Sequence, residues 1–240
     1  MILLEVRGLA KRFGGLQAVK DLSFSVGEGE IVALIGPNGA GKTTVFALVS
    51  GFLAPDAGEV AFRGRSLRGL APHAVNALGL ARTFQIMRPF PRLTVLRNVM
   101  VGALARHPKP GDAEARARAV LDEVELSARA DVPAGRLTLA ERKRLELARA
   151  LATEPRLLLL DEVMSGLNAS ETERIVALVR GVNARGIAIL LIEHVMRAVM
   201  SLAARIVVLD HGEPIAEGPP EFVARDRRVI EAYLGEEPDL

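Results

Sequence analysis

The chain has 240 residues, of which 50% are hydrophobic and 25% charged, with a formal net charge of +2 at pH 7. This length suits one large domain, and so small a net charge is not typical of a nucleic-acid-binding protein. The absence of cysteine excludes disulfides and thiolate metal sites. No apolar run approaches the roughly 20 residues that a spanning helix needs. We therefore expect a soluble chain whose membrane role would come through a partner.

The first part of the chain alternates short apolar segments with glycine-containing turns. Strands are expected at Leu3–Arg7, Leu22–Val26 and Glu59–Arg63, with turns at Gly14–Gly15 and Gly27–Gly29. Short strands joined by such turns are typical of antiparallel pairing. The sequence therefore predicts a small antiparallel β subdomain here.

Beyond this segment, continuous apolar runs alternate with longer stretches of helical period. Parallel strands buried on both faces have such continuous runs, and a βαβα order indicates a mainly parallel sheet flanked by helices. The expected strands are Ile31–Ile35, Leu157–Leu160, Ile187–Ile192 and Ile206–Leu209. The expected helices are Lys42–Ser50, Leu139–Thr153, Ala169–Ala184 and Val195–Ala203.

The middle of the chain is predicted to be more helical. Thr94–Arg106 and Asp112–Leu126 carry apolar residues at helical spacing, and a proline-rich loop separates them. We expect residues 86–137 to form a helical lobe inserted into an α/β core made of residues 1–85 and 138–240.

A glycine-rich loop follows the expected strand Ile31–Ile35 and precedes a helix. Glycines let backbone N–H groups point inward at phosphates, and the helix N-terminus adds the positive end of its dipole. We expect Lys42 to contact the β- and γ-phosphates, Thr43 to contact Mg²⁺, and Thr44 to contact the nucleotide as well. The loop fits the pattern G-x-x-x-x-G-K-S/T at every fixed position: Gly36-Pro37-Asn38-Gly39-Ala40-Gly41-Lys42-Thr43.

Two carboxylates, Asp161 and Glu162, follow the expected strand Leu157–Leu160. Open α/β sheets bind ligands at this edge, beyond the carboxyl ends of the strands. We expect Asp161 to hold Mg²⁺ through water, and Glu162 to deprotonate or orient the attacking water. A strand end with two solvated acids is the alternative.

The order and spacing of these motifs resemble the nucleotide-binding subunit of ABC transporters over essentially the whole chain. The resemblance implies a P-loop NTPase that binds ATP and Mg²⁺ and hydrolyses the ATP. Gln85 lies where the family has its Q-loop glutamine, which contacts Mg²⁺ and the lytic water, and His194 lies at the switch histidine. Phe13 lies where the family stacks an aromatic ring on adenine. Gln85, Glu162 and His194 are therefore the expected catalytic residues.

The family's signature motif is altered in this chain. It usually reads Leu-Ser-Gly-Gly-Gln, and here it reads Leu137-Thr138-Leu139-Ala140-Glu141. In the family, this motif contacts the ATP held by the opposite subunit, so the resemblance implies nucleotide contacts from Thr138 and Ala140. Thr138 keeps the hydroxyl, but both glycines are lost. We therefore expect a heterodimer with a second ATPase subunit, with a homodimer as the alternative.

Further motifs resemble the larger ATPase of branched-chain amino-acid importers. The resemblance implies two ATPases, two integral-membrane permeases and an extracytoplasmic solute-binding protein, with this chain at the cytoplasmic face of the membrane. Importers for amides, urea or aromatic acids share much of the pattern. Non-transport ABC ATPases need long insertions or tandem domains, and no nucleic-acid partner is expected. The motifs are Phe90–Val95, Asn98–Gly102, Glu193-His194 and Glu231–Gly235.

An apolar cluster rimmed by charges follows Gln85 and contains Met87, Phe90 and Leu93. Exposed apolar patches of this kind mark interaction sites. We expect a permease loop to dock here, and packing within the lobe's own core is the alternative.

Overall fold

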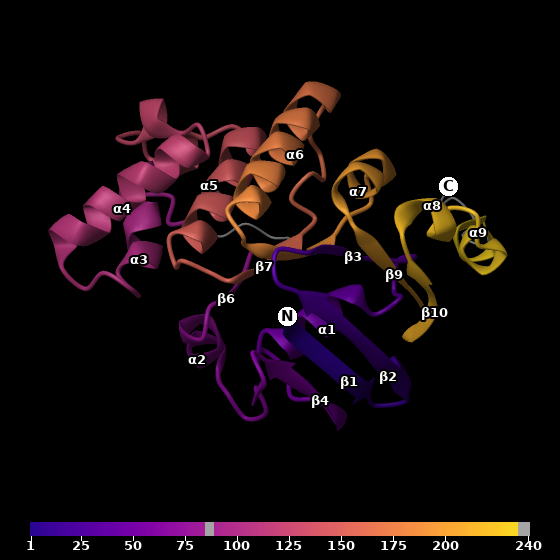
Figure 1. The fold of residues 1–240 in the computed structure, drawn as a ribbon. Coiled ribbons are helices and arrows are strands. Elements are labelled where there is room, and N and C mark those ends of the chain that lie inside the picture. Colours follow the sequence, from indigo (N-terminus) through magenta and orange to yellow (C-terminus); the bar gives the residue numbers. More distant parts are fainter. Residues whose placement is uncertain (85–88, 235–240) are drawn as a thin grey trace.

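The computed structural model describes residues 1–84 and 89–234, and this part of the chain contains two β-sheets with helices around them (Figure 1). The larger sheet has the strand order β10-β9-β3-β8-β7-β6, and the smaller has the order β2-β1-β4-β5. In the larger sheet every pairing is parallel except that of β10 with β9. The predicted mainly parallel core and small antiparallel sheet are therefore confirmed.

The strands are β1 (Ile2–Phe13), β2 (Leu16–Gly27), β3 (Ile31–Ile35), β4 (Ala57–Phe62), β5 (Arg65–Ser66), β6 (Leu80–Arg82), β7 (Leu157–Asp161), β8 (Ala188–Ile192), β9 (Arg205–Asp210) and β10 (Glu213–Gly218). The α-helices are α1 (Lys42–Val49), α2 (Pro72–Ala77), α3 (Val95–Ala103), α4 (Pro110–Glu123), α5 (Leu139–Leu151), α6 (Ala169–Ala184), α7 (Met196–Leu202), α8 (Pro220–Val223) and α9 (Arg227–Leu234). Two short 3₁₀ turns, Ser127–Arg129 and Ala134–Arg136, precede α5.

Two hydrophobic clusters cover the two faces of the large sheet. In β3, Val32 and Leu34 belong to the cluster shared with α1 and the small sheet. Ile31, Ala33 and Ile35 belong to the cluster shared with α3, α4, α5 and α6. Successive strand residues face opposite sides, so a strand buried on both faces is apolar throughout. This is why the continuous runs in the sequence predicted these strands well.

The hairpin β1–β2 is longer than the sequence predicted. Both strands have 12 residues and meet at the turn Gly14–Gly15, whereas only their central parts were expected. Four register shifts interrupt the pairing of β1 with β2. Each shift breaks the alternation of apolar and polar residues on which the prediction depended.

The helices α3 and α4 fall within the range predicted for the helical lobe, and Figure 1 shows them beside α5. Their buried residues belong to the same cluster as those of α5 and α6. The lobe is therefore packed continuously against the core, and its boundary at residue 137 stays a prediction. Within the described residues, no helix is long and apolar enough to cross a membrane.

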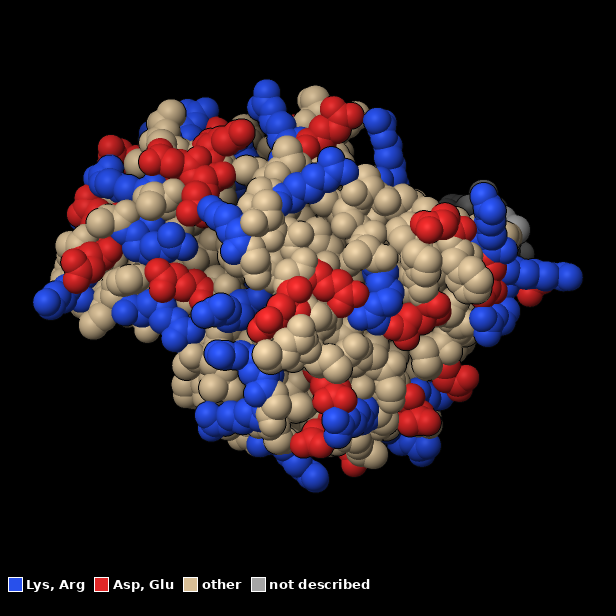
Figure 2. Space-filling view, viewed as in Figure 1, with Lys and Arg blue, Asp and Glu red and all other residues tan. Residues whose placement is uncertain are grey.

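Figure 2 shows Lys and Arg intermixed with Asp and Glu over the viewed face. The mixture is most evident around the helical part, where α3 and α4 lie. Nearby charges of opposite sign largely cancel one another at a distance. This face therefore presents no broad field of a single sign.

Two helix glycines provide a matched test of the packing between α3 and α5. A Cβ on Gly102 of α3 would lie 2.5 Å from the carbonyl oxygen of Arg149, whereas a Cβ on Gly181 of α6 would meet nothing within 4 Å. We expect Gly102→Ala to lower the free energy of unfolding by about 1–3 kcal/mol through overpacking. Gly181→Ala should raise it by about 0.5–1 kcal/mol. Urea unfolding measures both, and a Gly102→Ala protein as stable as the wild type would contradict the close approach of the helices.

Candidate nucleotide-binding site

The phosphate loop joins β3 to α1 and depends on glycine at two close contacts. A Cβ on Gly36 would lie 2.0 Å from the carbonyl oxygen of Leu209, and one on Gly41 would lie 2.2 Å from that of Ala18. Both glycines also have positive φ, at 147° and 100°. No other residue fits these positions without moving the neighbouring strands. The loop is thereby held tightly at the carboxyl end of β3 and at the N-terminus of α1.

Lys42 is buried against the loop that it follows. Its Nζ donates hydrogen bonds of 2.6 Å to the carbonyl oxygens of Gly36 and Pro37. The ammonium group therefore lies across the start of the loop, where a phosphate oxygen could accept the same protons. The structure brings the nine predicted loop residues together in the loop and the first turn of α1: Gly36, Pro37, Asn38, Gly39, Ala40, Gly41, Lys42, Thr43 and Thr44.

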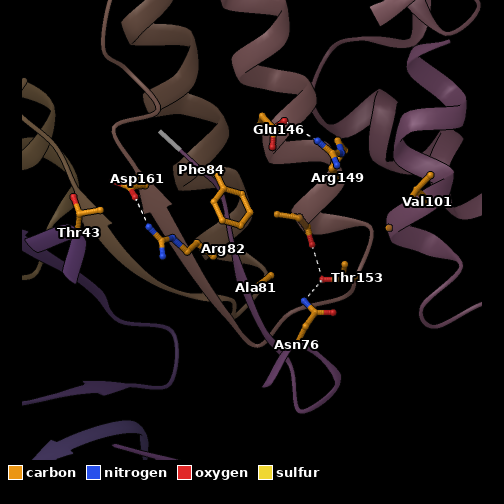
Figure 3. Close-up of a pocket in the computed structure, with 12 residues that line it drawn as sticks. Thr43, Asn76, Ala81, Arg82, Phe84, Val101, Glu146, Arg149, Thr153 and Asp161 are labelled. Atoms are coloured by element: carbon orange, nitrogen blue, oxygen red, sulfur yellow. Dashed lines mark hydrogen bonds and ion pairs between the residues drawn. The ribbon is translucent and has the colours of Figure 1, made fainter. Parts of the chain in front are cut away.

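Asp161 is the last residue of β7, and its side chain is 1% exposed. Its Oδ2 accepts a 2.8 Å ion-pair hydrogen bond from Arg82, while its buried Oδ1 has no hydrogen-bond partner among the described residues. Burial raises the pKa of Asp161, although the Arg82 guanidinium acts in the opposite direction. Asp161 and Thr43 line one groove, which brings a residue with a carboxylate and a residue with a hydroxyl group to the same cavity (Figure 3).

Glu162 and His194 are brought together at the ends of adjacent strands, β7 and β8. The Nε2 atom of His194 lies 2.8 Å from Oε1 of Glu162. Glu162 has a φ of 50°, and its amide donates to the carbonyl oxygen of Ile192. A left-handed conformation is uncommon for such a residue and is held here by surrounding contacts. The carboxylate is thus fixed one residue beyond Asp161.

Two buried charged residues to which the sequence assigned no role in the site hold the backbone of this turn. Nζ of Lys143, on α5, donates a 2.7 Å hydrogen bond to the carbonyl oxygen of Glu162. Glu193 accepts a 2.8 Å hydrogen bond from the amide of Met164. Burial lowers the pKa of Lys143, while Glu193, Glu162 and Asp161 act in the opposite direction. The position of Lys143 at the inner face of α5 was the one available signal in the sequence.

The remaining predicted site residues lie on other elements of the fold. Phe13 ends β1 and is 45% exposed, in the hairpin whose Ala18 touches the phosphate loop. Thr138 caps α5 by accepting from the amide of Glu141, and Ala140 lies in the first turn. The start of α5 and the phosphate loop belong to opposite faces of the sheet, because α5 packs in one core cluster and α1 in the other. Gln85 and Met87 lie outside the described residues.

A phosphate loop before a helix, with two carboxylates at the end of another parallel strand of the same sheet, defines a P-loop ATPase. The comparisons with known proteins agree. A family model described as "ABC transporter" matches residues 19–165. The chain therefore belongs to the ABC transporter family, as an ATP-binding cassette with ATPase activity. A second model, "Branched-chain amino acid ATP-binding cassette transporter", matches residues 213–239.

Several relatives are similar over nearly their whole length. The chain is 41% identical to the high-affinity branched-chain amino acid transport ATP-binding protein BraF of Pseudomonas aeruginosa, with 98% of each chain covered. It is 42% identical to the protein LivG of Salmonella typhimurium, which has the same description, again with 98% of each covered. A crystal structure of a nucleotide-free ATP-binding cassette from an ABC transporter matches with a TM-score of 0.90 at 31% identity, covering 98% of this chain and 100% of that one.

The buried carboxylate of Glu193 should give the protein a measurable pH dependence. Burial raises its pKa to about 6, from an ordinary value of 4.5. The folded state therefore favours the protonated acid, and the contribution of Glu193 to the free energy of unfolding falls as pH rises from about 4.5 to about 6. The total change is on the order of 2 kcal/mol. Glu193→Gln keeps an acceptor for the Met164 amide and should remove this fall.

Urea unfolding of both proteins at several pH values measures the difference. Above pH 6 the Glu193→Gln protein should be more stable than the wild type, and near pH 4.5 the two should converge. The exposed Glu173 provides the control, since Glu173→Gln should leave the pH dependence unchanged. Parallel curves for Glu193→Gln and the wild type would contradict the assignment.

Proposed function

We propose that this chain is the ATP-hydrolysing subunit of an importer for branched-chain or other hydrophobic amino acids. Hydrolysis is supported above all by the pair of Glu162 and His194 beside Asp161 at the carboxyl edge of the sheet. The solute class is supported by the names of the two relatives and by the match over residues 213–239. The chain would act at the cytoplasmic face of the membrane.

The site residues fit a magnesium ion bound with ATP. Mg²⁺ prefers oxygen ligands and in such sites takes one or two carboxylates, with phosphates and water completing its shell. The buried Oδ1 of Asp161 lacks a hydrogen-bond partner among the described residues, and Asp161 lines the same groove as Thr43. We assign Thr43, Asp161 and Gln85 to the ion. When bound, Mg²⁺ would neutralise charge on the β- and γ-phosphates.

The chain's own groups divide the remaining work. Lys42 would exchange its loop carbonyls for oxygens of the β- and γ-phosphates, and the backbone N–H groups of residues 38–44 would donate to the phosphate chain. The exposed ring of Phe13 would stack on adenine. Glu162 would orient or deprotonate the attacking water, and His194 would hold the Glu162 carboxylate in place.

The nucleotide site would be completed by a second ATPase subunit. The start of α5 cannot serve the phosphate loop of its own chain, because the two lie on opposite faces of the sheet. Thr138 and Ala140 would instead contact the ATP of the partner, through the hydroxyl and the free amides of the helix N-terminus. Leu139 is 43% exposed in this motif and would crowd that contact. We therefore favour a heterodimer, in which the partner supplies the better signature.

The groove of about 600 Å³ that Thr43 and Asp161 line at one end continues between β6, α3 and α5, and this other end provides the proposed docking site for a permease (Figure 3). Four exposed apolar side chains lie at or beside it, from 42% to 51% exposed: Phe52, Phe84, Phe90 and Val101. Arg149 and Glu146 form a 2.7 Å ion pair in its wall (Figure 3). An apolar segment of a permease cytoplasmic loop fits this surface. Through that permease, the chain would serve an extracytoplasmic solute-binding protein.

Replacing the proposed base tests the hydrolytic role. Glu162→Gln keeps the shape of the side chain but loses its basicity, so turnover should fall by about 10²–10⁴ while ATP binding persists. His194→Ala should also strongly reduce transport, because the Glu162 carboxylate loses its neighbour. ATPase rates of the assembled transporter and transport assays provide the measurements. Wild-type rates from either variant would remove that residue from the proposed mechanism.

A charge placed in the docking groove tests the permease contact. Phe90→Asp should release the permease and leave nucleotide affinity intact. The local fold should persist, because the Asn98 side chain hydrogen-bonds to the backbone of residue 90 and not to its ring. Phe222→Asp is the matched control, since Phe222 is 61% exposed on α8, away from the groove. Co-purification with the permeases is the readout. Assembly that survives Phe90→Asp would place the docking surface elsewhere.

A further inference from the structure

Arg82 and Asp161 form a buried ion pair to which the proposed hydrolysis assigns no task. The guanidinium Nη2 lies 2.8 Å from Oδ2 of Asp161, and the two side chains are 9% and 1% exposed. Arg82 ends β6, which pairs in parallel with β7, so both residues reach the same edge of the sheet. Figure 3 shows the pair between Thr43 and Phe84.

Three aromatic rings surround the Arg82 guanidinium. Its central carbon lies 5.6 Å from the ring centre of Phe46, 6.0 Å from that of Phe52 and 5.3 Å from that of Phe84. Aromatic faces attract cations, and the attraction is stronger where water is excluded. The guanidinium is therefore held at Asp161 by the carboxylate and by its apolar surroundings together.

The Asp161 carboxylate has one oxygen engaged and one available. Oδ2 accepts from Arg82, and the buried Oδ1 has no hydrogen-bond partner among the described residues. A divalent cation at Oδ1 would lie close to a fixed positive charge in a poorly hydrated place. Charges of the same sign repel more strongly there than in water. Arg82 should therefore weaken the attraction of Asp161 for a free metal ion.

We propose that Arg82 is the resident counter-cation of Asp161, which keeps the carboxylate neutralised until magnesium arrives together with the nucleotide. This inference rests on the metal role proposed above for Asp161. A free Mg²⁺ ion meets a carboxylate whose charge is already balanced. A Mg²⁺ ion that comes with the phosphates of ATP brings negative charge that offsets the repulsion from Arg82. The chain therefore selects the metal–nucleotide complex over the free metal.

The experiment measures magnesium binding to the isolated full-length chain by two readouts. Binding of a fluorescent ATP analogue is titrated with Mg²⁺, and Mn²⁺ bound to the chain without nucleotide is counted by EPR. Arg82→Met keeps the length of the side chain among the rings but removes its charge. It should lower the Mg²⁺ concentration at half-saturation by about tenfold, and nucleotide-free Mn²⁺ binding should appear. Arg82→Lys keeps the charge and should stay within about twofold of the wild type.

Arg205→Met is the matched control. Arg205 is a partly buried arginine paired with Glu30 at 3.0 Å, near the opposite ends of the strands, so its loss should leave Mg²⁺ half-saturation unchanged. Arg82→Gln, which can still donate to Asp161, replaces Arg82→Met if that protein does not fold. An unchanged or higher Mg²⁺ concentration at half-saturation in the uncharged Arg82 variants would overturn the inference. Asp161→Asn separates the two proposals, because an unchanged Mg²⁺ requirement there would instead defeat the metal role itself.

Discussion

Charged groups buried at the carboxyl ends of β6, β7 and β8 need partners, and their pairing is the constraint on which the site depends. Removing a charge from water costs several kcal/mol unless an opposite charge or hydrogen bonds replace the lost solvation. Arg82 meets this requirement for Asp161. Lys143 and Glu193 are buried on either side of the turn at Glu162 and attract each other. These pairs fix the turn that carries the proposed base.

The hydrogen bond from Lys143 to Glu162 connects the start of α5 with the turn that carries the proposed base. Lys143 lies on α5, the helix that begins at the altered signature, and it binds the carbonyl oxygen of Glu162. A displacement at the start of α5 would therefore reach the backbone of the proposed base. In the proposed dimer, the start of α5 serves the partner's ATP and Glu162 serves the chain's own. In that dimer, Lys143 would provide a physical link between the two nucleotide sites.

Contiguous motifs made much of the fold and site predictable. The phosphate loop, the strands buried on both faces and the helix Ala169–Ala184 were all predicted from local sequence, and the family assignment is confirmed. Strands β6 and β10 were not predicted, because one is short and the other is largely polar. Arg82 and Lys143 were missed because their partners are 79 and 19 residues away in the sequence. The roles of the individual site residues stay predictions.

The proposed heterodimer, in which two different subunits complete the nucleotide site, is tested by the ATPase rate at varied protein concentration. The rate is measured for this chain alone and after addition of the second ATPase subunit. The lone chain should bind Mg-ATP but hydrolyse it slowly, and the partner should raise the rate until the two subunits are equimolar. A fast rate from the lone chain, rising as the square of its concentration in dilute solution, would show an efficient homodimer and rule out the need for a different partner.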